Sequence, residues 1–174
     1  MVSGNLKKRF MALLIDYLLV VLWGVILFAI SMFIYNVILD GIPKFDEIGM
    51  NLISLTMIVP VILYSIIMEA GKKHGTLGKQ KMKIKVSAID CNAVNLRHII
   101  VRNMIKFLPW QFGHMMMFRG FALNWELSPY WKSMLIITVI LPIIWIAVVV
   151  IRNDHKGIHD LIAKTTVVDS FRTN

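Results

Sequence analysis

A single acidic residue, Asp16, interrupts the first long apolar stretch of the chain. It is the only charged residue between Phe10 and Leu39, in a stretch that reads MALLIDYLLVVLWGVILFAISMFIYNVIL. A carboxylate inside an apolar helix that crosses a bilayer costs about 2.5–3.5 kcal/mol on insertion scales. We therefore expect Asp16 either to pair with a basic group of the folded protein or to bind a proton or a cation.

Four further charged residues are candidates for the same chemistry. Arg9 lies seven residues before Asp16, roughly 10.5 Å along a helix axis, which is too far for an easy direct salt bridge. The best candidate partners of Asp16 are Arg102 and Lys106, and the best candidate partner of Arg9 is Asp160. The pairs would act as structural clamps, whose loss costs about 3–5 kcal/mol, or would tune Asp16 as a proton or cation site.

The sequence gives little support for a metal site, a nucleotide site or an enzyme active site. His155 and His159 would share a face of a helix, as two metal ligands can, but Gly157 weakens a helix there and no third ligand is apparent. We expect no metal and interpret His159 as a hydrogen-bonding residue at an interface. The segment GTLGKQK lacks the spacing of a phosphate-binding loop. Without a paired nucleophile and base, we expect neither an enzyme nor a cofactor.

Long apolar helices must position these residues. The chain of 174 residues is 57% hydrophobic and 17% charged, whereas soluble domains average about 45–50% and about 25%. Residues 10–36, 48–69 and 133–151 reach or nearly reach the roughly 20 residues that span a bilayer. On a helical wheel, residues 97–118 carry a polar face of about 120°, made of Arg102, Asn103, Lys106, Trp110, Gly113 and His114.

We therefore predict an all-α integral membrane protein, a bundle of four transmembrane helices that forms one domain over residues 1–174. The alternative for residues 97–118 is a helix that lies on the membrane surface. The first apolar stretch is too long for the core of a signal peptide, so we expect it to be retained. The single cysteine, Cys91, excludes an internal disulfide.

The distribution of basic residues predicts the orientation. The chain has 19 Lys and Arg, 10 Asp and Glu, and a net charge of +9. The amino end, the loop 71–96 and the tail 152–174 are basic, whereas the first loop is acidic. The positive-inside rule then places both ends and loop 71–96 in the cytoplasm of a multi-pass protein of the plasma membrane. We expect contacts with the bilayer and with anionic lipid headgroups, and none with nucleic acid.

Two short segments predict a small sheet beside the bundle. Residues 81–86 alternate lysine with an apolar residue, which is typical of a strand with one apolar face, and residues 90–92 would end it in a turn. Residues 165–168 read TTVV, a second candidate strand. An isolated strand leaves its backbone unpaired, so we predict that the two segments form a two-stranded cytoplasmic ribbon.

Three motifs, RFMALLIDYLL, GTLGKQKMKIKV and KGIHDLIAKTTVV, resemble the RDD family of bacterial membrane proteins and occur in the family's order. The arginine and the two aspartates that name the family match Arg9, Asp16 and Asp160. Other positions fit the family pattern, namely Gly75, Thr76, Gly78, Lys79, His159 and Thr165.

The resemblance implies a small helical membrane domain. A transport role is often proposed for the family, and cation/proton antiport has been attributed to some members. We therefore expect transport of a small ion or solute by a homo-oligomer or by a subunit of a membrane complex. The alternative is a non-transporting scaffold or regulatory subunit of such a complex.

Overall fold

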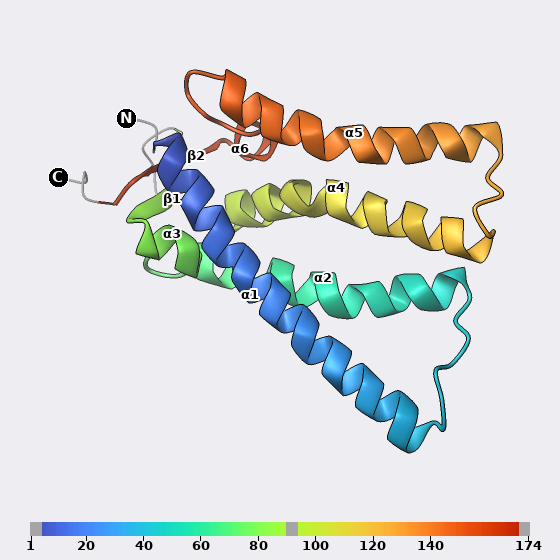
Figure 1. The fold of residues 1–174 in the computed structure, drawn as a ribbon. Coiled ribbons are helices and arrows are strands. Elements are labelled where there is room, and N and C mark those ends of the chain that lie inside the picture. The colour runs from blue at the N-terminus through green and yellow to red at the C-terminus, as the bar shows by residue number, and fades with distance from the viewer. Residues whose placement is uncertain (1–4, 90–93, 171–174) are drawn as a thin grey trace.

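The computed structural model describes residues 5–89 and 94–170. Four long helices dominate it: α1 (Leu6–Phe33, continued by the π-helical turn η1, Ile34–Ile38), α2 (Glu47–Ala70), α4 (Leu96–Ala122) and α5 (Pro129–Ile151). The short elements are helices α3 (Leu77–Lys81) and α6 (Ile158–Ile162) and strands β1 (Ile84–Ala88) and β2 (Thr165–Asp169). Figure 1 shows α4 between α2 and α5, while α1 runs obliquely to these three helices.

Side-chain caps start three of the long helices. The Oδ1 atoms of Asn5, Asp46 and Asn95 accept hydrogen bonds of 2.9, 2.8 and 3.0 Å from backbone N–H groups in the first turns of α1, α2 and α4. These residues satisfy donors that a helix start leaves unpaired. Pro129 is the first residue of α5, where its missing N–H has no cost.

Three helices are long and apolar enough to cross a membrane: Leu6–Ile38, Glu47–Ala70 and Pro129–Ile151. Their large apolar side chains are mostly exposed on the single chain, as lipid-facing side chains are. Helix α4 has 27 residues, but its basic residues make it less apolar than the other three. The prediction of a helical protein with membrane-spanning segments is confirmed, and three of the four predicted spans meet the criterion.

The predicted pairing of the two strands is confirmed. β1 and β2 are antiparallel, and Val86 lies opposite Val167, with 1% and 2% of their surfaces exposed. The predicted start of the first strand is wrong. Residues 77–81 form α3, and β1 begins only at Ile84 because Lys83 has a left-handed backbone (φ 58°). The predicted turn at residues 90–92 lies outside the described residues.

The two halves of the chain repeat one order of elements, α1–α2–α3–β1 and α4–α5–α6–β2. In each half a histidine with positive φ (His74, 48°; His155, 50°) precedes the short helix, and a lysine with positive φ (Lys83, 58°; Lys164, 50°) precedes the strand. Helix α3 packs on α1, and α6 packs on α4. Each short helix therefore brings polar side chains against the first long helix of its own half.

Candidate functional site

Five charged side chains from five helices meet at the end of the bundle that carries the sheet. Arg102 of α4 lies between two carboxylates: its Nη1 is 2.5 Å from Asp160 Oδ1, and its Nε is 3.3 Å from Glu69 Oε2. Lys79 of α3 pairs with Glu69, and Arg9 Nη1 of α1 is 3.6 Å from Asp160 Oδ2. We call these residues the charge network: Arg9, Glu69, Lys79, Arg102 and Asp160.

The charge network is almost completely removed from solvent. Glu69 and Asp160 are 0% exposed, Arg102 is 3% exposed and Lys79 is 9% exposed. Burying a charge is tolerable only when partners surround it. The network holds three cations and two anions, and it joins α1, α2, α3, α4 and α6. It therefore holds the segments after α2 and α5 against the long helices.

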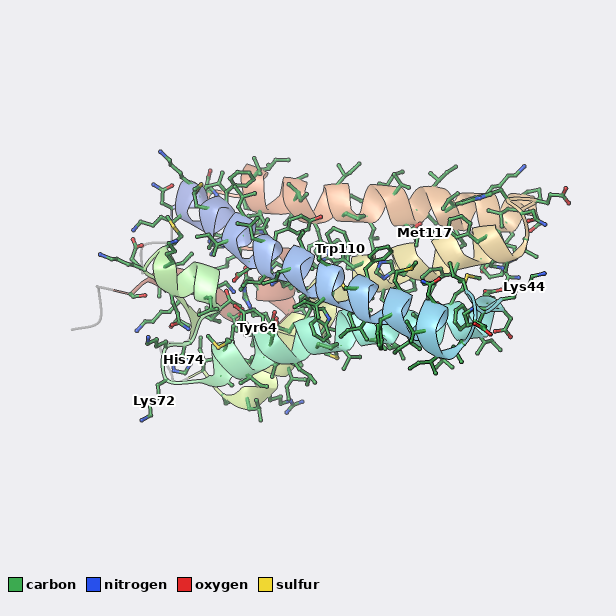
Figure 2. All side chains as sticks on the ribbon, turned by 60° about the horizontal axis from the view of Figure 1, so that its bottom comes forward. Lys44, Tyr64, Lys72, His74, Trp110 and Met117 are labelled. Atoms are coloured by element: carbon green, nitrogen blue, oxygen red, sulfur yellow. The ribbon has the colours of Figure 1, made fainter. Side chains whose placement is uncertain are left out.

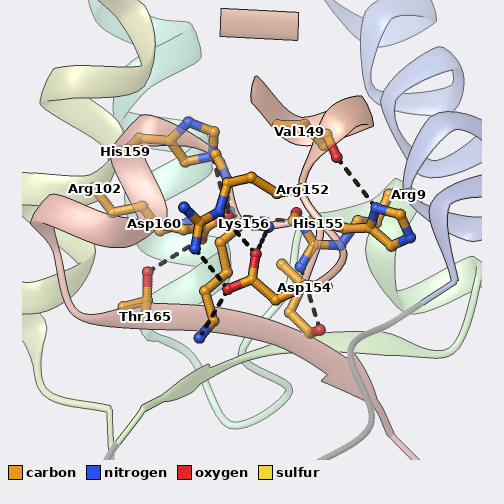
Figure 3. Close-up of polar contacts among 12 residues, drawn as sticks. Arg9, Arg102, Val149, Arg152, Asp154, His155, Lys156, His159, Asp160 and Thr165 are labelled. Atoms are coloured by element: carbon orange, nitrogen blue, oxygen red, sulfur yellow. Dashed lines mark hydrogen bonds and ion pairs between the residues drawn. The ribbon is translucent and has the colours of Figure 1, made fainter. Parts of the chain in front are cut away.

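Both oxygens of Asp160 have partners besides the arginines. Thr165 Oγ1 donates to Oδ1 over 3.2 Å, and the Gly157 N–H donates to Oδ2 over 3.1 Å. Gly157 is the residue before α6, so this second bond also satisfies a donor at the helix start. Figure 3 shows Asp160 between Arg102 and Arg9. The carboxylate is therefore fully engaged within the chain.

Asp16 holds α3 against α1. Thr76 Oγ1 donates to its Oδ2 over 2.5 Å, and the Gly78 N–H and the Tyr64 hydroxyl donate to its Oδ1 over 2.9 and 3.4 Å. A Cβ atom on Gly78 would lie 2.1 Å from the carbonyl oxygen of Ala12. Glycine is therefore required for the backbone of α3 to reach α1, which brings its N–H within reach of Asp16.

Of the two predicted partners of Asp16, Arg102 is wrong, whereas Lys106 attracts Asp16 through space. Arg102 forms its ion pairs with Glu69 and Asp160 instead, while Tyr64, Thr76 and Gly78 donate to the oxygens of Asp16. Lys106 forms no salt bridge with Asp16 but lines the same cavity. The structure does bring Arg9 and Asp160 together, as the sequence predicted.

Electrostatic interactions keep Asp160 charged and leave the neighbouring His159 neutral. Burial would raise the pKa of Asp160, but the positive charge of Arg102, with a smaller contribution from Arg9, holds that pKa at about 2. Burial, aided by the charge of Arg102, lowers the pKa of His159 to about 3. Burial also lowers the pKa of Lys79 to about 8 against the attraction of Glu69. At neutral pH, His159 is therefore an uncharged neighbour of Asp160, with Nε2 3.5 Å from Oδ2.

The pair His155 and His159 does not share a helix face. His155 lies before α6 with φ 50°, and its Nδ1 is 3.2 Å from the Val149 carbonyl oxygen. Within residues 5–89 and 94–170, no three residues of types His, Cys, Asp and Glu are arranged to hold a metal ion.

A cavity of about 310 Å³ lies beside Asp16, between α1, α2 and α4. Its wall is mainly apolar, and Figure 2 shows Tyr64 and Trp110, which belong to it, beside α1. The residues of the polar face predicted for 97–118 thus lie in two different sites: Arg102 belongs to the charge network, and Lys106 lines the cavity. The lining consists of Leu13, Asp16, Tyr17, Val20, Met57, Ile58, Val61, Tyr64, Ser65, Lys106, Phe107, Trp110 and His114.

Sequence reasoning missed Glu69 and Tyr64 as members of the site, and it placed Asn103 on the polar face of residues 97–118 without giving it a partner. Glu69 pairs with Lys79 and Arg102 and accepts a hydrogen bond of 2.9 Å from Asn103 Nδ2. The signal for Glu69 was its position, directly after the uncharged stretch that ends at Met68. Nothing in the sequence distinguishes Tyr64 from other aromatic residues of the spans.

Comparison with known proteins identifies the family. No curated protein and no solved structure matches the chain. A model of the RDD family matches residues 4–164, a range that includes the first two motifs, the third motif up to Lys164, the charge network and the cavity. This protein, with its three helices apolar enough to span a membrane, belongs to the RDD family.

Proposed function

We propose that this protein moves a small solute or ion across a membrane, and that the solute binds in the cavity beside Asp16 and Lys106. The observation that most directly supports this proposal is the cavity of about 310 Å³ among the long helices, which has a carboxylate and an ammonium in its wall. Ionisable residues inside membrane segments are costly and typically mark solute or proton pathways. A volume at the lower end of the usual 300–1,000 Å³ for ligand pockets suits a small solute.

The proposal includes four crossings of the plasma membrane, with both ends and the sheet in the cytoplasm. Helix α4 is as long as a span needs to be and packs on both α2 and α5. Its buried polar residues, Arg102 and Asn103 (3% and 0% exposed), face the protein, which removes them from lipid. An even number of crossings then leaves the basic loop and tail on one side, as the positive-inside rule requires. A homo-oligomer would supply the further walls that four helices lack.

Blocking the cavity tests this proposal. Val61 lines the cavity, whereas Leu63, two residues further along α2, is 50% exposed and does not. We expect Val61→Trp to stop flux into proteoliposomes and Leu63→Trp to leave it intact, since both variants add the same bulk. The assay follows an internal pH dye after addition of sodium, potassium or a small carboxylate under a proton gradient. Absence of wild-type flux above empty liposomes, or equal flux in both variants, would refute transport through the cavity.

A second candidate function is a scaffold or regulatory subunit of a membrane complex. The three hydrogen bonds that Asp16 accepts from Tyr64, Thr76 and Gly78 support it, because they commit both carboxylate oxygens to partners within the chain. It predicts that Asp16→Asn lowers the amount of folded protein and the recovery of the partner. It also predicts no intrinsic flux at any pH.

A further inference from the structure

Lys106 is a cation in the cavity wall that makes no direct hydrogen bond or salt bridge with an acid among the described residues. It forms no hydrogen bond or salt bridge with any residue that the structure describes, and its Nζ lies 5.0 Å from the centroid of the Phe107 ring. The other acids at this end of the bundle are engaged: Glu69 and Asp160 pair with the other members of the charge network. Glu69, and more weakly Asp16 and Asp160, attract the Lys106 ammonium through space. The ammonium still lacks a directly hydrogen-bonded acceptor among the described residues, and a bound anion would supply one.

Asp16 lines the same cavity and attracts Lys106 through space, but it forms no hydrogen bond or salt bridge with Lys106. Its two oxygens accept hydrogen bonds from Thr76, Gly78 and Tyr64, which direct the carboxylate toward α3. His114, also in the lining, has a buried Nδ1 atom with no hydrogen-bond partner among the described residues. The cavity wall therefore holds an ammonium without a directly hydrogen-bonded acceptor and a histidine whose Nδ1 has no hydrogen-bond partner among the described residues.

The rest of the wall selects for an apolar body. Aliphatic and aromatic side chains make up most of the lining. Two of them, Tyr17 and Trp110, are 55% and 56% exposed, so the cavity is open to its surroundings beside them. Such a wall favours flat or branched hydrocarbon groups, which gain from leaving water. It offers little to a bare hydrated ion.

We propose that the cavity binds an organic monocarboxylate with a small apolar body, whose carboxylate pairs with Lys106 Nζ and whose hydrocarbon part lies against Phe107 and Trp110. This assignment rests on the proposed function, since it names the solute class of the same cavity. A charge-assisted hydrogen bond between ammonium and carboxylate supplies the selectivity for charge, and the apolar wall supplies the affinity for the body.

Three ligands with one ring test the assignment: benzoate, neutral benzamide and cationic benzylammonium. Their binding is measured by calorimetry with the full chain in phosphatidylcholine nanodiscs. We expect benzoate to bind about tenfold or more tighter than benzamide, because hydrogen bonds to charged groups contribute about that factor, and benzylammonium not to bind. An octanoate arm shows whether fatty acids of the bilayer share the site with soluble acids.

Variants at one position separate charge from folding. Lys106→Met should remove the preference for benzoate over benzamide, Lys106→Arg should keep it, and Lys81→Met, on the exposed surface of α3, should not change it. Equal affinity for benzoate and benzamide, or full benzoate binding by Lys106→Met, would overturn the assignment.

The two proposals fail differently. Sodium or potassium flux that Val61→Trp blocks, without any benzoate binding, would leave transport standing and overturn the carboxylate as its solute. Benzoate binding that depends on Lys106, without flux of any tested solute, would leave the binding site standing and overturn transport.

Discussion

Replacing Asp160 by asparagine should destabilise the protein by about 3–5 kcal/mol, the cost of breaking a buried ion pair. The residue is 0% exposed, and the change leaves Arg102, 2.5 Å away, and Arg9, 3.6 Å away, without their carboxylate. The lowered pKa of Asp160 alone gives a lower bound for this loss of stability. A pKa of about 2 against an ordinary 3.8 corresponds to about 2 kcal/mol of stability at neutral pH.

The sign of the pH dependence follows from the lowered pKa. Because the folded protein holds the Asp160 proton less tightly than the unfolded chain does, this contribution is present above pH 3.8 and is lost as the pH falls through about 2. The difference in stability between wild type and Asp160→Asn should therefore be constant near neutral pH. It should shrink between pH 4 and pH 2, the window that the two pKa values define.

The matched control is Asp169→Asn in the same tail. Asp169 Oδ1 lies 2.6 Å from Lys8 Nζ, but the two side chains are 28% and 38% exposed, and an exposed pair contributes less than about 1 kcal/mol. Both variants are compared with wild type by reversible unfolding in mixed detergent micelles, followed by tryptophan fluorescence. If the two variants unfold within about 1 kcal/mol of each other, the charge network does not stabilise the fold as argued.

Three further predictions concern the segments beside the charge network. Gly78→Ala should lower the free energy of unfolding by about 1–3 kcal/mol through overpacking, since its Cβ would meet the α1 backbone at 2.1 Å. The control, Gly113→Ala, has nothing within 4 Å of its Cβ and should not destabilise the protein in the same unfolding assay. Val86→Cys combined with Val167→Cys, in a background that lacks Cys91, should form a disulfide, because directly opposed residues of the two strands lie close enough. A shift in gel mobility that reductant reverses reports the disulfide. Absence of the shift would contradict the register of β1 and β2. Lys164→Gly should raise the free energy of unfolding by up to about 1 kcal/mol by relieving a φ of 50°, and a loss of stability would argue against strain there.

Much of the fold could be predicted because its signals are local. Apolar length predicted the three helices that meet the criterion for a span, and motif order predicted the RDD family. The two strands were recognised because strand propensity at 165–168 and the lysine alternation near 84–86 act over a few residues. The start of β1 was not recognised, because Lys81, the first lysine of the alternating pattern, is the last residue of α3. The left-handed Lys83 that separates the helix from the strand has no distinctive residue type.

The sequence by itself determined which charges need partners; the tertiary structure decided which partners they have. The isolation of Asp16 in an apolar helix is a property of the sequence, and so is the expectation that something must satisfy it. Its partners, Thr76 and Gly78, depend on how closely α3 approaches α1, a distance set by packing. Arg102 likewise pairs with Asp160 and Glu69. Coulomb attraction acts between atoms that are close in space, and the packing of the helices brings those atoms together.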